Sequence, residues 1–491
     1  MKLKIVLFAN LICLPLMAQR DYSLIERRNA WLKSGNAAAL TTFADSSVAR
    51  ASLRYRYEGG KLRSVSEGKN VNYFDADVRS YYRLSKSVVA YGRMAYDNFN
   101  GSKMAGSMFM PTTELMPFDL IGYSEDVAGD KHAETFNVTG AVGWKVCRSL
   151  SIGARADYTA GTYAKHRDLR HTNTLMDLDT KVNALLSFDC NGGVGAGFVY
   201  RRRTETMLFD VYGTTDRIYS TLVDYANHQG EIETFGVEGF TDGSNEQPFL
   251  SEYVGFNAQG NWKGLFADVA YLHRTGYYGK RSQYTASHER HRGDATSVHL
   301  RYDLPHVASH LVWIDANVST ERLTAERENY RRMTSGNGGA ATYYEYYEPT
   351  KMSDKTQTQG SLSVNVYWKP AGEIFLWHIN GGVNYWTRHQ TAYVYPDIFT
   401  EKPHVLMPFV EAKRGLLNSK SSLLSLQAGC AVLTGSVEQI AAHAKVAYEM
   451  PIRGTRVRPE VSLRYDFRNA MGGDMKGWSR NLLTLCAAAT F

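Results

Sequence analysis

The sequence predicts an all-β chain that forms a transmembrane antiparallel outer-membrane β-barrel of about 18 strands (16 to 18). Three observations predict this fold. Segments of about nine to eleven residues alternate apolar and polar side chains along most of the chain. The connections between these segments are alternately short and long, as at the two rims of such barrels. The last segment is an apolar strand that ends on Phe491.

Residues 1–18 have the layout of a secretory signal peptide. Lys2 and Lys4 precede an apolar run from Ile5 to Met17, which is followed by Ala18. The run is too short to span a bilayer as a helix, which takes about 20 residues. We therefore expect cleavage near Ala18 and export to the outer membrane of a Gram-negative bacterium.

Residues 19–46 form a periplasmic N-terminal segment before the first strand. Leu24, Ile25, Trp31 and Leu32 fall on about one face of a helix. One interpretation is a plug or hatch that enters the barrel from the periplasm. The other is a short helix that rests on the rim. Either way, this segment is the gating candidate.

The barrel itself is expected over residues 47–491. In its first strand, Leu53, Tyr55 and Tyr57 alternate with Arg54 and Arg56, so apolar side chains face one side and charged ones the other. The short connections are residues 84–87, 145–149, 190–192, 261–264, 305–309, 369–373 and 451–455. The long connections are residues 98–134, 203–250, 276–294 and 322–355. Every short turn falls on the periplasmic side if the chain starts there.

The terminal strand predicts both closure and assembly. In a bilayer every backbone donor and acceptor must pair, so the last strand must pair with the first. The ending "NLLTLCAAATF" resembles the C-terminal strand of bacterial outer-membrane proteins. That resemblance implies that the barrel assembly machinery reads Phe491 as an assembly signal. Outer-membrane lipid and lipopolysaccharide are the other expected partners.

Two further stretches carry a family resemblance. The region "LMAQ" and the segment "WLKSGNAAALTTF" resemble uncharacterised outer-membrane β-barrel proteins of Bacteroides-like bacteria, a family with no activity to transfer. More distantly, "GNAAAL" is similar to the "NPAGL" segment in the N-terminal hatch of long-chain fatty acid transporters. Asn36, Ala38 and Leu40 match that segment, whereas Ala37 and Ala39 replace its proline and glycine.

Charged side chains that share the inward face of neighbouring strands predict a wall of the lumen. The basic members are Arg50, Arg54, Arg56, Arg79, Arg83, Arg93, Arg456, Arg458 and Arg464, and the acidic members include Asp75, Asp77 and Glu460. Gathered arginines would favour anionic solutes. The plainer interpretation is a ladder of internal ion pairs that keeps the lumen polar. Both can hold.

The long loops carry aromatic stretches such as "YYEYYEP" (residues 343–349). Tyrosine offers a flat amphipathic surface to a ligand or to an outer-membrane protein partner, although such loops also simply pack over a barrel mouth.

The rest of the sequence carries few signals of binding or catalysis. The formal charge of +7 is too mild to indicate nucleic acid. We find no catalytic motif, and we expect no enzyme activity, no metal site and no cofactor.

The sequence thus predicts a channel or transporter for small hydrophilic solutes, with anions a candidate class. Two alternatives stay open. A plugged barrel could be the accessory partner of an outer-membrane uptake or export complex. A transporter of hydrophobic ligands would need a kinked strand, for which Pro408 and Pro459 are the positions to inspect.

Overall fold

The structure is a computed structural model. It describes residues 22–44, 47–122, 127–188, 192–212, 218–235, 247–279, 281, 285–305, 310–335, 341–368, 376–417 and 422–491. The expected signal peptide, residues 1–18, lies outside the described residues. Cys147, Cys430 and Cys486 are free thiols.

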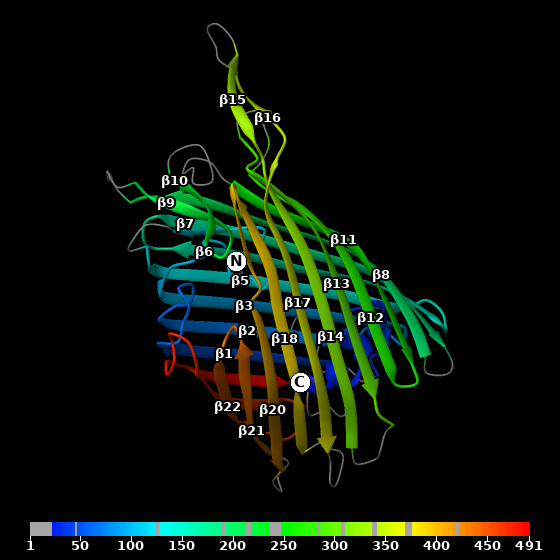
Figure 1. The fold of residues 1–491 in the computed structure, drawn as a ribbon. Coiled ribbons are helices and arrows are strands. Elements are labelled where there is room, and N and C mark those ends of the chain that lie inside the picture. The colour runs from blue at the N-terminus through cyan, green and yellow to red at the C-terminus, as the bar shows by residue number, and fades with distance from the viewer. Residues whose placement is uncertain are drawn as a thin grey trace, which may run out of the picture.

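The described chain forms one large antiparallel sheet that closes on itself (Figure 1). The sheet has 19 strands, of which β19 (Asp397–Glu401) pairs with β18 alone, and the other 18 form the barrel. The barrel strands are β1 (Val48–Gly60), β2 (Asn70–Arg83), β3 (Val88–Met104), β5 (Gly129–Lys145), β6 (Leu150–Lys165), β7 (Arg170–Phe188), β8 (Gly192–Asp210), β11 (Gln247–Trp262), β12 (Leu265–Tyr278), β13 (Glu289–Asp303), β14 (His310–Arg327), β17 (Thr350–Trp368), β18 (Trp377–Val394), β20 (His404–Leu417), β21 (Leu423–Gly435), β22 (Gln439–Glu449), β23 (Arg458–Ala470) and β24 (Ser479–Thr490). The predicted fold class is confirmed.

The first and last strands close the ring. β1 pairs with β24 from Arg50 opposite Thr490 to Gly60 opposite Arg480. Beyond this ladder, the Ala49 amide donates to the Phe491 carbonyl at 2.7 Å, and the Phe491 amide donates back to Ala49 at 2.9 Å. The barrel therefore leaves no open edge at the junction of its ends.

Alternation sorts the side chains between lipid and lumen. Leu53, Tyr55, Leu483 and Leu485 are exposed on the outer face at the closing seam, and apolar side chains continue this band around the barrel. Aromatic side chains stand at the ends of strands near the short turns: Trp144, Phe188, Trp262, Tyr302, Trp368 and Phe491. An apolar band bordered by an aromatic girdle is the surface of an outer-membrane barrel, in which the short turns face the periplasm.

The strands run further toward the long loops than the sequence predicted. β8 continues to Asp210 and β11 begins at Gln247, so both ends of the expected loop 203–250 are strand. The loops at this rim carry structure of their own. A three-stranded sheet is formed by β4 (Asp119–Gly122), β9 (Ser220–Ala226) and β10 (Gln229–Thr234). The hairpin of β15 (Tyr330–Ser335) and β16 (Ala341–Tyr346) projects beyond the barrel (Figure 1).

Three short helical elements precede the barrel: α1 (Tyr22–Arg28), α2 (Ala30–Lys33) and η3 (Ala38–Thr42). Asn29 ends the first and caps the second, because its side-chain oxygen accepts from the Trp31 amide at 3.1 Å. In the described part of the chain, no helix combines the length and the apolar character needed to cross a membrane.

Candidate functional site

The lumen of the barrel is the candidate functional site, and residues 22–43 lie inside it. We call these residues the N-terminal segment. Its side chains contact barrel strands as far apart as β1 and β17: Phe43 packs with Val48, and Leu24 packs with Tyr367. The N-terminal segment therefore crosses the barrel near the rim of short turns.

The four apolar residues predicted to share one helical face do not share one. The helix is interrupted at Asn29, and the side chains spread to different parts of the barrel. Leu24 packs on Trp313, Ile25 lies in the cluster around Tyr81, and Leu32 packs against that same cluster. Trp31 contacts Phe266 edge-on, with ring centroids 5.2 Å apart. The interruption lets the segment fill a round lumen, which one straight amphipathic face could not do.

Polar contacts fix the position of the segment. Asn36 donates to Gln259 Oε1 at 2.7 Å, and the Ala37 amide donates to Asn183 Oδ1 at 3.1 Å. Glu26 accepts from the Tyr81 hydroxyl at 2.9 Å. Each of these partners lies on a barrel strand, so the contacts hold the segment in one place within the lumen.

Two glycines in the barrel make room for the segment. A Cβ atom on Gly143 of β5 would lie 2.5 Å from the Ala37 carbonyl oxygen and 3.0 Å from Leu40 Cβ. A Cβ atom on Gly153 of β6 would collide with the Ala37 backbone. Because side chains are absent at both places, η3 rests directly on the barrel.

The predicted charged wall is present on the strands, but as ion pairs. Asp75 accepts from Arg54 at 2.6 Å and pairs with Arg56 at 3.4 Å. Asp77 pairs with Arg79 at 2.7 Å and with Arg93 at 2.5 Å. Three further pairs are Arg50 with Glu460, Arg458 with Glu449, and Arg464 with Asp466. The sequence allowed two interpretations, a wall that selects anions and a ladder of internal ion pairs. The arrangement in the structure is the ladder.

Two arginines of that set have other surroundings. Arg456 lies in the turn between β22 and β23, so its predicted position on the penultimate strand is wrong. The residue falls just before the strand begins, where alternation no longer decides which way a side chain points. Arg83 donates to the backbone carbonyl of Phe43 and thus contacts the N-terminal segment.

A basic cavity of about 390 Å³ lies beside the N-terminal segment. Five cations line it: Lys33, Arg79, Arg93, Arg155 and Lys181. Nearby carboxylates orient them, as Asp157 does for Arg155 with two hydrogen bonds of 2.6 and 2.9 Å. The cations keep further N–H groups available to the cavity, because a guanidinium has five and an ammonium three.

A second cavity, of about 630 Å³, lies along β12 to β20 and is mostly uncharged. Asn317, Gln359, Ser361 and Asn384 line it together with Trp386. In the same region, the register of β20 with β21 skips from Leu406 to Phe409, leaving out Met407 and Pro408. Pro459, by contrast, keeps its ladder partner Ala489.

The connection from β3 to β4 also enters the lumen. We call residues 105–118 the inner loop. Its backbone is held from three sides of the barrel: the Met110 amide donates to Glu205 at 2.6 Å, the Leu115 carbonyl accepts from Arg274 at 2.7 Å, and the Met116 carbonyl accepts from Lys355 at 2.9 Å. The inner loop therefore crosses the barrel, as the N-terminal segment does nearer the opposite rim.

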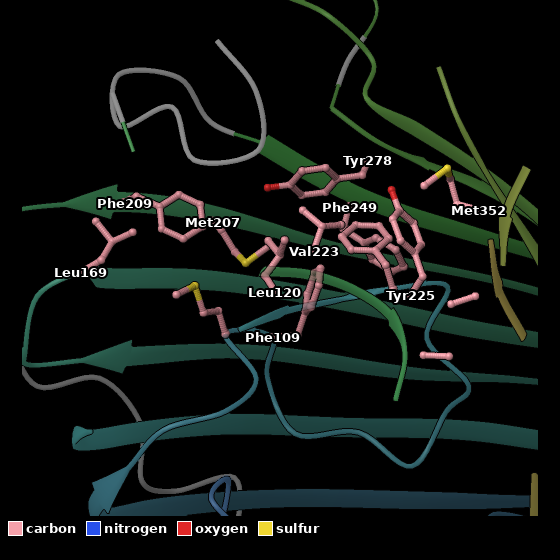
Figure 2. Close-up of a cluster of buried hydrophobic side chains, with 14 of the residues drawn as sticks. Phe109, Leu120, Leu169, Met207, Phe209, Val223, Tyr225, Phe249, Tyr278 and Met352 are labelled. Carbon is pink, nitrogen blue, oxygen red and sulfur yellow. The ribbon is translucent and has the colours of Figure 1, made fainter. Parts of the chain in front are cut away.

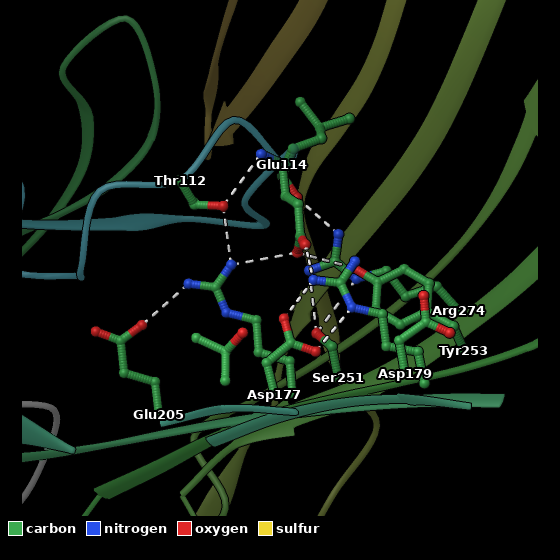
Figure 3. Close-up of polar contacts among 12 residues, drawn as sticks. Thr112, Glu114, Asp177, Asp179, Glu205, Ser251, Tyr253 and Arg274 are labelled. Atoms are coloured by element: carbon green, nitrogen blue, oxygen red, sulfur yellow. Dashed lines mark hydrogen bonds and ion pairs between the residues drawn. The ribbon is translucent and has the colours of Figure 1, made fainter. Parts of the chain in front are cut away.

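Glu114 of the inner loop meets an arginine cluster (Figure 3). Its carboxylate pairs with Arg201, and it accepts from Arg203 at 3.3 Å and from the Tyr253 hydroxyl at 3.2 Å. Burial alone would raise the pKa of this carboxyl, but the charges of Arg201, Arg203 and Arg274 outweigh burial and hold the pKa below its usual value. Glu114 is therefore an anion held by cations of the barrel.

An apolar cluster lies where the inner loop meets the strands near the rim of long loops (Figure 2). Phe109 and Phe118 of the inner loop pack with Phe249 and Tyr278 of the barrel, with ring centroids 5.3 to 6.5 Å apart. Val223 and Tyr225 of β9 complete the cluster. We call β4, β9 and β10 the lid. Burial of the Asp119 carboxyl in the lid raises its pKa to about 6.

Sequence analysis missed the arginine cluster and the basic residues of β6 and β7. A signal was present in "YRRRTET", where Arg201, Arg203 and Glu205 alternate with outward residues. No local pattern could identify Glu114, because its carboxylate reaches the cluster only through the path of a loop. Among the residues that the structure describes, no three His, Cys, Asp or Glu side chains lie together as a metal site would require.

The fold and the lumen define an outer-membrane β-barrel whose interior is crossed by two segments of its own chain. The chain belongs to a family of unknown function, DUF6850, which matches residues 37–435. No curated protein matches the chain.

Three solved barrels illustrate the similarity, each at low sequence identity. The ferric preacinetobactin receptor BauA of Acinetobacter baumannii is 10% identical, with a TM-score of 0.44 over 91% of this chain and 80% of that one. The toluene transporter TodX of Pseudomonas putida is 8% identical, with a TM-score of 0.31 over 93% and 91%. A FadL homologue of Pseudomonas aeruginosa is 10% identical, with a TM-score of 0.30 over 93% and 92%. We draw no argument about substrate from these values.

Proposed function

We propose that the protein is a gated outer-membrane transporter for small hydrophilic solutes, that it favours anions, and that the N-terminal segment is its gate. The observation that carries the proposal is the basic cavity directly beside this segment. Lys33 belongs to the segment itself, whereas Arg79, Arg93, Arg155 and Lys181 belong to β2, β3, β6 and β7. A solute that passes the segment on this side of the barrel meets these cations and the carboxylate of Glu26.

The ion pairs limit how strong the preference for anions can be. Asp77 and Asp157 compensate much of the charge of Arg79, Arg93 and Arg155. Oriented guanidinium groups still offer N–H donors to a carboxylate or a phosphate inside a low-dielectric enclosure. We therefore expect moderate anion preference and no complete exclusion of cations.

The segment is suited to leave its place without unfolding the barrel. Its contacts with the barrel are hydrogen bonds of about 0.5–1.5 kcal/mol each, an ion pair between Lys33 and Asp315, and apolar clusters, and none of them is a strand pairing. The barrel strands keep their own backbone ladders whether or not the segment is present. Displacement therefore exposes lumen surface and breaks no strand pairing.

A disulfide lock tests the proposal. Thr41→Cys with Ser151→Cys joins η3 to β6, where the two hydroxyl oxygens that the sulfurs replace lie 3.0 Å apart, about one ångström more than the ~2.05 Å S–S bond. The native cysteines are replaced by serine, and conductance and reversal potential are recorded in a planar bilayer under a salt gradient.

We expect the oxidised lock to be silent, and we expect reduction to produce an anion-preferring conductance. The matched control is Thr41→Cys alone, whose conductance reductant should leave unchanged. Equal conductance with the lock closed and open would remove the N-terminal segment from gating. A conductance that prefers cations would remove the anion preference.

A second function, that of an accessory partner, is favoured by one observation. The β15–β16 hairpin projects beyond the barrel and exposes Tyr343 and Tyr347 (Figure 1). Such a surface fits a partner protein in an outer-membrane uptake or export complex. An outer-membrane protein that copurifies with the whole chain, and no longer does so after deletion of residues 330–346, would support this function.

The remaining expectations from the sequence stay predictions. They are export through a cleaved leader at residues 1–18, recognition of Phe491 by the barrel assembly machinery, contact with lipopolysaccharide, an origin in Bacteroides-like bacteria, and passage of hydrophobic ligands near Pro408.

A further inference from the structure

We infer that the arginine cluster beneath the inner loop is a binding site for a carboxylate-bearing solute, and that Glu114 occupies this site as an internal competitor. The inference rests on the proposed function in one respect: the solute must reach the cluster through the lumen of the barrel. Binding of the solute would displace Glu114 and free the adjacent part of the inner loop.

The surroundings of Glu114 are those of a ligand carboxylate. Arg201, Arg203 and the Tyr253 hydroxyl all donate to its two oxygens (Figure 3). Two guanidinium groups and a phenol in such an arrangement recognise a planar anion. All three donors lie on barrel strands, and Glu114 alone comes from a loop.

The barrel holds these donors in place without Glu114. Asp177 accepts from Arg201 Nε at 2.8 Å, and Glu205 accepts from Arg203 Nη2 at 3.2 Å. Arg274 is fixed by Glu321 at 2.9 Å and by the Ser251 hydroxyl. The site is therefore organised before a ligand arrives, which reduces the entropy cost of binding.

One donor of the cluster is unused. Arg203 is 4% exposed at its side chain, and its Nε has no hydrogen-bond partner among the described residues. A buried guanidinium N–H without a partner carries a free-energy cost. Glu114 reaches Arg203 only at Nη1, and at a long 3.3 Å. A free carboxylate, which is not tied to the loop, can approach Arg203 more closely than Glu114 does.

The lumen gives a solute access to this site. Pro111, Thr112 and Thr113 are exposed, and the Glu114 side chain retains 19% of its surface. Thr112 also accepts from Arg203 at 2.9 Å, so the exposed tip and the carboxylate are held by the same arginine. A competing anion at Arg203 would weaken both contacts together.

Only part of the inner loop depends on Glu114. The carbonyls of Leu115, Met116 and Pro117 accept from Arg274, Lys355 and Ser353, and these bonds do not involve the carboxylate. Displacement of Glu114 therefore frees residues 111–114 and leaves the following residues in place. The Glu114 amide, which donates to Thr112 Oγ1 at 3.2 Å in the closed loop, reports this change through its rate of hydrogen exchange.

The test measures the exchange of this amide and needs no conduction. Deuterium labelling of the amide at position 114 is followed in the folded, detergent-solubilised full chain. Succinate is the probe, succinamide is its uncharged counterpart, and sodium chloride at equal ionic strength controls for screening. Folding of every variant is checked by heat-modifiable gel mobility.

We expect succinate to accelerate labelling about tenfold, since a hydrogen-bonded charged group stabilises the closed loop by roughly this factor. Glu114→Gln should label fast without succinate and respond to it no further. Tyr253→Phe, which removes one donor and keeps the ring, should show an intermediate rate. Glu411→Gln is the matched control, because Glu411 is another lumen carboxylate and pairs with His443, away from the inner loop.

Three results would overturn the inference: no acceleration by succinate beyond sodium chloride, equal acceleration by succinamide, or equal labelling of Glu114→Gln and Glu411→Gln. Its failure differs from failure of the proposed function. If the barrel is silent but succinate accelerates deuterium labelling at position 114, the result argues against transport and supports the site. If the barrel conducts and the labelling does not respond to succinate, the result supports transport and argues against the site.

Discussion

Asn36 donates a hydrogen bond to Gln259 Oε1 at 2.7 Å, and both side chains are buried inside the barrel. Asn36 Oδ1 in turn accepts from the Ala39 amide at 3.3 Å, while Gln259 donates to Asp268 at 3.1 Å. Asn36 thus stabilises the fold of the N-terminal segment and its attachment to β11 with one side chain. A residue in this position is costly to replace, because its partners stay buried.

Asn36→Leu should loosen the N-terminal segment by about 1–3 kcal/mol, the cost of leaving buried partners without hydrogen bonds. The measurement is hydrogen exchange at the Ala37 amide, which donates to Asn183 in the seated segment. Exchange there should become faster by one to two orders of magnitude. Asn384→Leu, at a lumen amide of the second cavity, should leave it unchanged. Equal exchange in Asn36→Leu and in the unmodified chain would contradict the role given to Asn36.

Gly143→Ala should displace the N-terminal segment by changing only the barrel. The added Cβ would lie 2.5 Å from the Ala37 carbonyl oxygen, so η3 must move away. We expect a higher conductance in a planar bilayer and faster proteolysis of residues 22–43. Gly140→Ala is the control, since a Cβ at Gly140 on the same strand meets nothing within 4 Å. If both variants behave alike, close packing at Gly143 does not seat the segment.

Alternation along the sequence was enough to predict the barrel, because lipid and water impose a period of two on every strand. It also placed Arg54, Asp75 and Arg79 on the lumen side, where the structure has them. Alternation does not predict where each strand ends. Arg456 falls in a turn, and the strands next to the long loops extend further than the apolar pattern, because strands outside the membrane need no lipid-facing residues.

The contents of the lumen could not be predicted in the same way. The N-terminal segment was expected to enter the mouth or to rest on the rim. Its position depends on Gly143 and Gly153, which leave space for η3 because β5 and β6 are neighbours in the barrel, and the sequence does not show this. Glu114 reaches Arg201 across 87 positions of sequence. Such contacts depend on loop paths, which carry no periodic signal.

Neutralising arginines of the lumen should shift ion selectivity toward cations. We combine Arg54→Gln, Arg79→Gln and Arg93→Gln in one triple variant. In this variant, the carboxylates of Asp75 and Asp77 lose arginine partners at 2.5 to 2.7 Å and keep their own charge. The lumen thus loses three positive charges. The reversal potential of the conducting state under a salt gradient measures the shift. Arg202→Gln is the control, because Arg202 points outward on the strand that carries Arg201. An unchanged reversal potential in the triple variant would show that the three replaced arginines do not determine ion selectivity.

Phe491→Ala should lower the yield of assembled barrel without altering the barrel once it has formed. The side chain is exposed at the girdle, whereas the hydrogen bonds with Ala49 come from the backbone and survive the substitution. Assembly in cells is measured as the heat-modifiable fraction in the outer membrane. Phe491→Tyr should restore the yield, and Phe188→Ala, at another exposed aromatic near the same rim, should have a smaller effect. Normal yield from Phe491→Ala would remove its role as an assembly signal.

The lid should loosen as pH rises through about 6. The pKa of Asp119 is raised to about 6, chiefly by burial and further by the nearby charge of Asp224, whereas Lys355 and Lys131 provide the facing cations. A carboxyl with a higher pKa in the closed lid than in water takes up a proton on closing, so the closed state loses stability as that proton is lost. Below about pH 3 the group is protonated in both states and contributes no pH dependence.

Hydrogen exchange at the Met108 amide, which donates to the Leu120 carbonyl at 2.7 Å, reports opening of the lid. After correction for intrinsic exchange, opening should increase between about pH 5 and pH 7 in the unmodified chain. In the unmodified chain the Ser107 hydroxyl donates to Asp119 Oδ1 at 2.7 Å. Asp119→Asn keeps an oxygen that can accept this hydrogen bond and removes the carboxylate charge. This variant should give a flat profile in the same range. A flat profile in the unmodified chain, or the same slope in both, would show that Asp119 does not control the lid.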